Sequence, residues 1–217
     1  MLADKSGAEL ASLLDAISTN LTAFGREPGH FHYLAQEILP GWGEVRGPLR
    51  KNFWSAGCST GEEAYTLAMI MLDAFRQVDL SGVTIYASDL NTQVLSQAEQ
   101  GIYAHSRVEP LPVEWRRRFF QKGVRDREGY VRVKAEVRRL VQFFRFNLME
   151  PFPFREEMDI IFCRNVMIYF EKKTQSELVE KFFHTLKPGG YLFIGHSESL
   201  CNYQHLFRYV KPAIYRK

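Results

Sequence analysis

The stretch that decides the fold is residues 52–78, NFWSAGCSTGEEAYTLAMIMLDAFRQV. Its first six residues are rich in aromatic and small side chains and end at a glycine, a pattern that predicts a short strand. From Thr60 to about Val78, apolar residues cover most of the circumference of a predicted helix, so we expect that helix to be buried. A strand that leads through a glycine turn into a buried helix is the opening unit of an α/β fold.

The same alternation of strand and helix continues along the chain. The predicted elements are a strand at 83–89, a helix at 91–100, a strand at 158–165, a helix at about 173–186, a strand at 190–196 and a C-terminal hairpin in LFRYVKPAIYRK. We therefore predict a doubly wound α/β domain over residues 52–217, with a largely parallel sheet, helices on both faces and right-handed crossovers.

Two segments fall outside this rhythm. Residues 107–145 contain short alternating runs such as GYVRVKAEV and LVQFFRFN, which we interpret as antiparallel strands of a small β insertion. Residues 1–51 read as a short N-terminal helical segment, with one helix at about 4–17, a second at about 28–39, and a loop from Gly41.

Composition excludes several classes of protein. The chain has 217 residues, 46% hydrophobic and 24% charged, which fits one globular domain with a small insertion and excludes a largely disordered chain. No apolar run approaches the roughly 18–20 residues that span a bilayer, and no signal peptide is visible. Cys58, Cys163 and Cys201 are widely spaced and the six histidines are scattered, so we expect reduced thiols, a cytoplasmic location and no metal.

The charge is unevenly distributed. The formal net charge is +3, yet residues 107–145 carry 12 basic and 5 acidic side chains, and the rest of the chain is net acidic. One interpretation is that the insertion presents a positive face to an acidic partner. The alternative is a solvated strand surface, since Lys and Arg also protect sheet edges from aggregation.

The turn after the first predicted strand, SAGCSTGEE, is the first candidate site. Ligands of doubly wound sheets bind at the carboxyl ends of strands, and small residues such as Gly57 let the backbone approach a ligand. The turn lacks GxGxxG and a Walker lysine, which argues against a dinucleotide or P-loop site. The alternative is a capping box, with Thr60 capping the helix and Glu63 reaching back.

Two further strand ends carry polar residues. Asp89 closes the second predicted strand, where a carboxylate can accept hydrogen bonds from both ribose hydroxyls of an adenosine-containing ligand; alternatively, it caps the next helix. Arg164 and Asn165 follow the third strand, an unusual place for polar groups unless they line a ligand crevice. Tyr169 lies nearby in an apolar run, where a tyrosine is commonly a core aromatic with a satisfied hydroxyl.

Taken together, these stretches resemble one family, the chemotaxis receptor methyltransferases of the CheR type. The resemblance covers about residues 18–217 and rests on NLTAFGRE, WSAGCSTGEEAY, ASDLN, FNLME, CRNVMIYF, LKPGG and GHSESL. It implies transfer of a methyl group from S-adenosylmethionine to glutamate side chains of chemoreceptors, leaving S-adenosylhomocysteine. It also implies a cytoplasmic receptor domain as partner, a monomer, and neither nucleic acid nor membrane insertion.

The resemblance also implies roles for particular residues. Arg26 and Tyr169 match residues at the methyl-transfer site, and the insertion matches a β-subdomain that docks a receptor-tail peptide in some members. The expected cofactor contacts, with Gly57 added from the turn itself, are Asn20, Thr22, Arg26, Gly57, Glu63, Asp89, Asn147, Leu148, Arg164 and Asn165.

Two departures from the family pattern stand out. Gly25 replaces the second of two aromatic residues before Arg26, which loosens the backbone there. Only about 18 residues precede NLTAFGRE, so the family's basic N-terminal helical domain is largely missing, which we interpret as a shortened branch or a truncated chain. Alternative functions are therefore a methyltransferase acting on a small molecule or RNA, and a non-catalytic module that binds cofactor or receptor.

Overall fold

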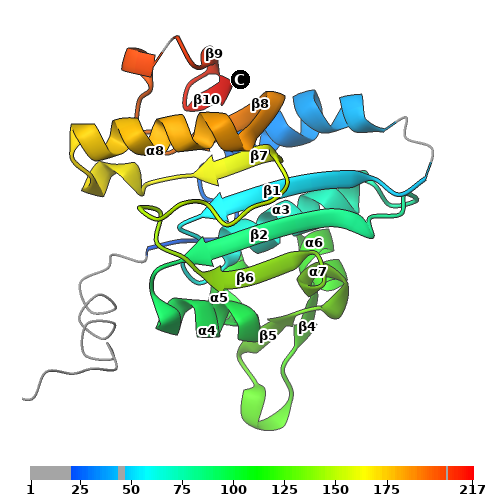
Figure 1. The fold of residues 1–217 in the computed structure, drawn as a ribbon. Helices are drawn as coiled ribbons and strands as arrows, with labels where there is room; N and C mark the ends of the chain where they lie inside the picture. The colour runs from blue at the N-terminus through cyan, green and yellow to red at the C-terminus, as the bar shows by residue number, and fades with distance from the viewer. Residues whose placement is uncertain (1–20, 44–46, 204) are drawn as a thin grey trace, which may run out of the picture.

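A computed structural model describes residues 21–43, 47–203 and 205–217 (Figure 1). Its centre is a seven-stranded sheet in the order β6-β2-β1-β7-β8-β10-β9. The strands are β1 (Arg50–Ala56), β2 (Gly82–Asp89), β6 (Val141–Arg145), β7 (Met158–Cys163), β8 (Leu186–Ile194), β9 (Arg208–Lys211) and β10 (Ile214–Arg216). Strands β6, β2, β1, β7 and β8 run parallel, and β10 and β9 form the predicted antiparallel hairpin at the edge.

Helices cover both faces of this sheet, which confirms the predicted fold class. Successive residues of a strand point to opposite faces, so Phe53 of β1 packs in a core with α3 (Glu62–Ala74) while Trp54 packs in a second core with α8 (Lys172–Thr185). Helix α4 (Thr92–Gln100) contributes Leu95 to the first core. Both aromatic side chains of β1 are fully buried, so both faces of the sheet are covered at its centre.

The antiparallel insertion is present, but the strands that form it are not all the predicted ones. A three-stranded sheet in the order β3-β5-β4 is made by β3 (Ile102–Ala104), β4 (Phe120–Lys122) and β5 (Tyr130–Val133). The short helices α5 (His105–Val108), α6 (Val113–Phe119), η3 (Arg125–Arg127) and α7 (Ala135–Arg138) flank these strands. The division of the chain into domains otherwise stays a prediction.

The interpretation of LVQFFRFN as an antiparallel strand of the insertion is wrong. Its residues form β6, which pairs parallel with β2 at the edge of the main sheet, Ile85 opposite Val141. A half-buried edge strand has the same alternating pattern in either kind of sheet, so periodicity does not identify the partner strand.

The second predicted N-terminal helix is present, but it runs on to Trp42, so the prediction of a loop from Gly41 is wrong at its start. Helix α2 (Pro28–Tyr33) continues as one turn of π-helix, η1 (Leu34–Ile38), and as a 3₁₀ turn, η2 (Leu39–Trp42). The helical run passes Pro40 because proline fits the first turn of η2. Phe31 stacks on Phe162 of β7, which holds this segment on the sheet. The helix expected at about 4–17 lies outside the described residues.

The remaining short elements are η4 (Met167–Tyr169) and η5 (Cys201–Tyr203). Among the described residues, no helix has the length and apolar character needed to cross a membrane.

Candidate functional site

The parallel strands bring the candidate residues to one edge of the sheet. Strands β1, β2 and β7 end at Ala56, Asp89 and Cys163, and their arrowheads point to the same side in Figure 1. The turns that follow these three ends therefore meet, as expected for the ligand-binding edge of a doubly wound sheet.

Gly57 joins two of these turns. Its backbone has φ 81°, in the left-handed region, and its N–H donates to the Ser88 carbonyl oxygen at 2.8 Å. A Cβ at this position would lie 2.5 Å from Cγ2 of Val166 in the turn after β7. Glycine is therefore required here both by backbone conformation and by the close approach of the neighbouring turn.

The alternative interpretation of this turn, a capping box formed by Thr60 and Glu63, is wrong. Helix α3 begins at Glu62 behind Gly61, and the Thr60 hydroxyl donates to Oε2 of Glu62 at 2.6 Å. Glu63 faces the strand ends instead, where its Oε1 accepts a hydrogen bond of 2.6 Å from the Ser55 hydroxyl. Burial raises the pKa of Glu63, although the neighbouring guanidinium of Arg164 favours its ionised form.

Asp89 organises the turns after β1 and β2. Its Oδ2 accepts the Ser59 N–H at 2.8 Å and its Oδ1 accepts the Asn91 N–H at 3.0 Å. Asn91, not Asp89, caps α4, because its side chain accepts the N–H groups of Gln93 and Val94. The capping alternative for Asp89 is therefore wrong, and its carboxylate lies at the ligand edge.

Arg164 is the charged centre of the site. It is buried, and its Nη2 donates to the Arg26 carbonyl oxygen at 2.6 Å. Its Nε lies 3.2 Å from Oε2 of Glu63 and 3.6 Å from Oε2 of Glu27. One guanidinium thus joins the N-terminal loop to α3 and β7. The side chain of Arg26 itself donates from Nη1 to the Leu21 carbonyl oxygen at 2.7 Å.

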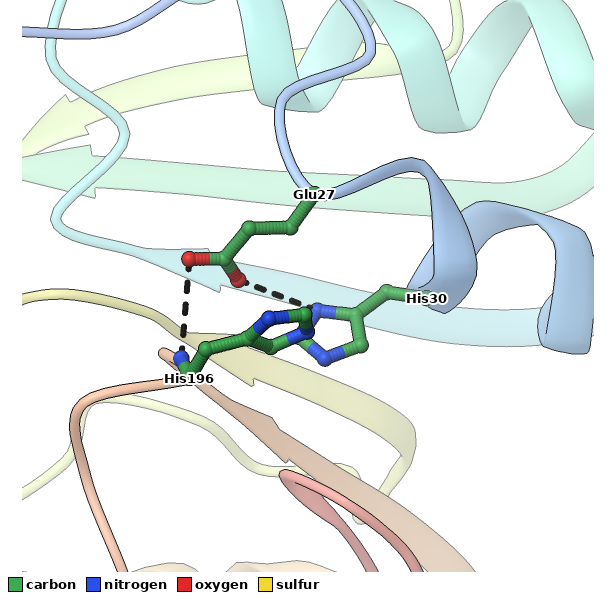
Figure 2. Close-up of side chains that lie close together, drawn as sticks. All are labelled: Glu27, His30 and His196. Carbon is green, nitrogen blue, oxygen red and sulfur yellow. Dashed lines mark hydrogen bonds and ion pairs between the residues drawn. The ribbon is translucent and has the colours of Figure 1, made fainter.

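Glu27, His30 and His196 form a polar cluster beside Arg164 (Figure 2). Oε1 of Glu27 accepts Nδ2 of Asn165 at 3.3 Å and the His196 N–H at 3.5 Å. Oε2 of Glu27 lies 3.4 Å from Nδ1 of His30. The cluster therefore ties the N-terminal loop to the turns after β7 and β8.

The charge states of this cluster follow from burial and from Arg164. Burial opposes ionisation of Glu27, but Arg164, Asn165 and the two histidines outweigh it and hold its pKa below the ordinary value. Burial, followed by the charge of Arg164, lowers the pKa of His30 to about 4, so this imidazole is neutral at pH 7.

This geometry also bears on metal binding. The donor atoms of Glu27, His30 and His196 lie within 4.8 Å of one another. However, the Glu27 carboxylate already pairs with Arg164 and accepts a hydrogen bond from Asn165, and the positive charge of the guanidinium repels a metal cation. We therefore treat the three residues as a polar cluster held around Arg164, in which the ring nitrogens of His30 have no hydrogen-bond partner among the described residues.

The other predicted site residues are distributed around this edge. Tyr169, in η4, is 61% exposed, so its interpretation as a core aromatic is wrong. Asn147 follows β6, and its Oδ1 accepts the Met149 N–H at 3.0 Å. The Leu148 side chain is buried in the core with α8. Asn20 lies outside the described residues.

Several residues of the site were missed by the sequence analysis, first among them Arg107 and Glu62, which lie beside the predicted Thr22. The Thr22 carbonyl oxygen accepts Nη2 of Arg107 at 2.9 Å, and the same guanidinium pairs with the fully buried Glu62. Glu27, His30, His196 and Glu198 were likewise not singled out. All four lie in or just after the quoted motifs NLTAFGRE and GHSESL, which was the only available signal.

The parallel sheet, the glycine turn after β1, the carboxylate at the end of β2 and the buried polar groups at the same edge define an S-adenosylmethionine-dependent methyltransferase of the doubly wound class. A family model described as "CheR methyltransferase, SAM binding domain" matches residues 20–215. The chain belongs to this CheR methyltransferase family.

Two relatives are similar to nearly the whole chain. The chain is 42% identical over 213 residues to chemotaxis protein methyltransferase 2 of Pseudomonas aeruginosa, covering 98% of this chain and 75% of the relative. It is 40% identical over 218 residues to the chemotaxis protein methyltransferase of Salmonella typhimurium, covering 98% and 72%. Among solved structures, the glycopeptide N-methyltransferase MtfA with S-adenosylmethionine is 16% identical, with a TM-score of 0.43 over 82% of this chain and 57% of that one.

Proposed function

We propose that this protein methylates glutamate side chains in the cytoplasmic domain of a bacterial chemoreceptor. Family membership supports the reaction class, and the site supports the roles of particular residues. The observation that carries the proposal is the junction at Arg164, which brings the loop with Arg26 against the turn with Asn165 and Tyr169.

The residues at this edge fit S-adenosylmethionine. Nη1 of Arg164 is buried and has no hydrogen-bond partner among the described residues, so it is available to a polar ligand. Asp89 at the end of β2 suits the ribose hydroxyls. Thr22, Asn147, Leu148 and Asn165, together with Asn20, complete the proposed cofactor contacts.

The bound cofactor supplies a methyl group activated by the positive sulfur. With the cofactor held there, a glutamate carboxylate oxygen of the receptor would accept the methyl group, and the electron pair of the broken carbon–sulfur bond would return to sulfur. The products are a methyl ester and S-adenosylhomocysteine. An ionised glutamate has no proton to remove, so no side chain of this protein acts as a general base.

Positioning provides most of the catalysis in this proposal. Anionic nucleophile and cationic donor neutralise each other in the transition state, so a strong ion pair with the substrate would favour the ground state and slow the step. Alignment of the two reactants can lower the activation free energy by about 7–11 kcal/mol. Arg26 aligns the substrate carboxylate, and the exposed Tyr169 orients it beside the methyl group.

The receptor is the proposed partner, and the basic insertion is its proposed docking surface. Arg117, Lys122, Arg125, Arg127 and Arg132 of this region are exposed. These positive side chains suit an acidic receptor surface or a tail that ends in a free carboxylate. This partner also implies a cytoplasmic location.

A methylation assay tests the proposed function. The chain is incubated with methyl-labelled cofactor and a chemoreceptor cytoplasmic fragment, and we expect base-labile label that is released as methanol from the fragment. The control fragment carries Gln or Ala in place of its candidate glutamates. Label on RNA or a small molecule instead would support a different substrate, and cofactor binding without turnover on several fragments would support a non-catalytic module.

A further inference from the structure

The turn after β7 carries much of the proposed site and packs on the core through the buried Met167, while its tip is exposed. Arg164 and Asn165 precede η4, and Ile168 and Tyr169 within it are 46% and 61% exposed. Asn165 adopts φ 58°, a left-handed conformation that asparagine tolerates better than most residues with a side chain. Contacts from outside the turn add to its own packing.

Glu198, in the segment after β8, provides that support. Its carboxylate accepts four backbone N–H groups, and three of them belong to the turn. The bonds run from Asn165 (3.1 Å) and Gly195 (2.6 Å) to Oε2, and from Val166 (3.0 Å) and Ile168 (3.2 Å) to Oε1. Hydrogen bonds to an ionised acceptor are stronger than neutral ones, so one side chain fixes the path of the turn.

Gly195 allows the two segments to approach this closely. A Cβ at Gly195 would lie 2.8 Å from the backbone nitrogen of Asn165 and 2.9 Å from its Oδ1. Contacts under 3.0 Å force a shift of the neighbouring atoms. Gly195 and Glu198, both in GHSESL, thus together hold the turn in place.

Side-chain packing under the turn is incomplete. A cavity of about 120 Å³ lies between the turn, α8 and the segment after β8, lined in part by Met167, Ile168, Val179 and Glu198. Hydrogen bonds therefore add to the packing of Met167 in holding the turn beside this cavity. Gln175 of α8 adds two of them, from Nε2 to the carbonyl oxygens of Met167 and Phe170, each at 2.9 Å.

We propose that Glu198 is a positioning residue for methyl transfer. By holding the backbone of the turn, it places Arg164 and Asn165 for the cofactor and Tyr169 for the reacting methyl group. The inference rests on the proposed function of these residues, but its structural part, the anchoring of the turn, is measurable without catalysis.

Replacement of Glu198 by glutamine tests the anchoring. The amide keeps the size of the side chain but loses the charge and turns one acceptor oxygen into an NH₂ donor that faces backbone N–H groups. We expect faster hydrogen exchange at the amides of Asn165, Val166 and Ile168. Glu180→Gln, the same change on the exposed face of α8, is the matched control and should leave these amides unchanged.

Kinetics separate positioning from general stabilisation. We expect Glu198→Gln to raise the KM for S-adenosylmethionine and the Kd for S-adenosylhomocysteine by about tenfold, and to lower kcat, with the KM for receptor unchanged. A variant that merely loses folded molecules would lower the apparent kcat and leave both KM values unchanged. Circular dichroism below the unfolding temperature checks that each variant is folded.

Gly195→Ala provides a second, independent variant, because it displaces the same turn without a change of charge. The same pattern of exchange and kinetic changes is expected. Unchanged exchange in both variants, or faster exchange with wild-type KM and kcat, would overturn the inference. A wild-type chain that binds no S-adenosylhomocysteine and transfers no methyl group would instead count against the proposed function.

Discussion

At the scale of single residues, the site is built around one buried cation. The guanidinium of Arg164 lies between the carboxylates of Glu63 and Glu27 and over the rings of Phe31 and Phe162, 5.3 and 5.9 Å from their centroids. A buried charge is tolerated only when it is paired. Arg164 therefore contributes both to the stability of the fold and to the proposed cofactor site.

Replacement of Arg164 by glutamine should destabilise the fold as well as abolish cofactor binding. The change leaves the partly buried carboxylates of Glu27 and Glu63 without their cation, and removal of one partner of a buried pair costs at most about 3–5 kcal/mol. Urea unfolding measures this loss. Arg155→Gln, at an exposed arginine before β7, is the control. A loss equal to that of the control would contradict the pairing described.

Ionisation of Glu63 lowers the stability of the fold, whereas the charge of Arg164 supports it. Because burial raises its pKa, its ionised form is disfavoured in the folded state, and stability is lost as the pH rises from the unfolded value of about 4.3 through the raised folded value. We expect the stability of Glu63→Gln relative to the wild type, measured by urea unfolding, to rise between pH 3 and pH 7, because only the wild type has to ionise this side chain in the folded state. The variant should also bind S-adenosylhomocysteine more weakly. A stability difference that does not change with pH would show that the pairing with Arg164 offsets burial.

At the scale of elements, the site is made by turns that interlock at the ends of parallel strands. The turn after β1 contacts the turn after β7 through Gly57 and Val166, and the turn after β7 is held in turn by the segment after β8. Each turn also contacts its own helix, as the bonds from Gln175 of α8 to the turn after β7 show, and the contacts between turns add to these. Displacement of one turn should therefore be felt at the others.

Gly57→Ala tests this coupling. The new methyl group meets Cγ2 of Val166, and φ 81° is strained for alanine, so we expect a loss of about 1–3 kcal/mol in unfolding free energy and weaker binding of S-adenosylhomocysteine. The double variant Gly57→Ala/Val166→Ala removes the clash but retains the backbone strain. Recovery of part of the lost affinity in the double variant is expected, whereas no recovery would assign the whole effect to the backbone.

At the scale of the whole molecule, a basic antiparallel insertion is attached to an acidic α/β body. Arg107 of α5 makes the connection, since it contacts both the Thr22 carbonyl oxygen and the buried Glu62 of α3. The exposed arginines of the insertion are therefore held in a fixed position relative to the site. The arrangement suits recognition of a large acidic partner away from the reacting groups.

Charge reversal on the insertion tests this separation. Arg132 is exposed on β5, so Arg132→Glu should lower kcat/KM for receptor methylation, and wild-type activity should fall with rising salt. Binding of S-adenosylhomocysteine should not change. Arg155→Glu, before β7, is the control. If salt and Arg132→Glu have no effect on receptor methylation, the arginines protect strand edges and do not dock a partner.

The sequence by itself determined the elements that local patterns encode. The buried strand and helix of residues 52–78, the parallel sheet and the C-terminal hairpin follow from hydrophobic periodicity and turn residues, which are properties of neighbouring positions. The quoted motifs also located Asp89, Arg164 and Asn165 at strand ends. These predictions needed no knowledge of which strand lies beside which.

The tertiary structure decided what depends on distant partners. It assigned LVQFFRFN to β6, turned Glu63 from a helix cap toward Arg164, and brought Glu27 and Glu198 to Asn165 from opposite ends of the chain. The physical reason is that an alternating pattern or a carboxylate defines only what kind of partner it needs. Which partner it obtains depends on sheet order and on the meeting of turns at one edge, and only the folded chain sets both.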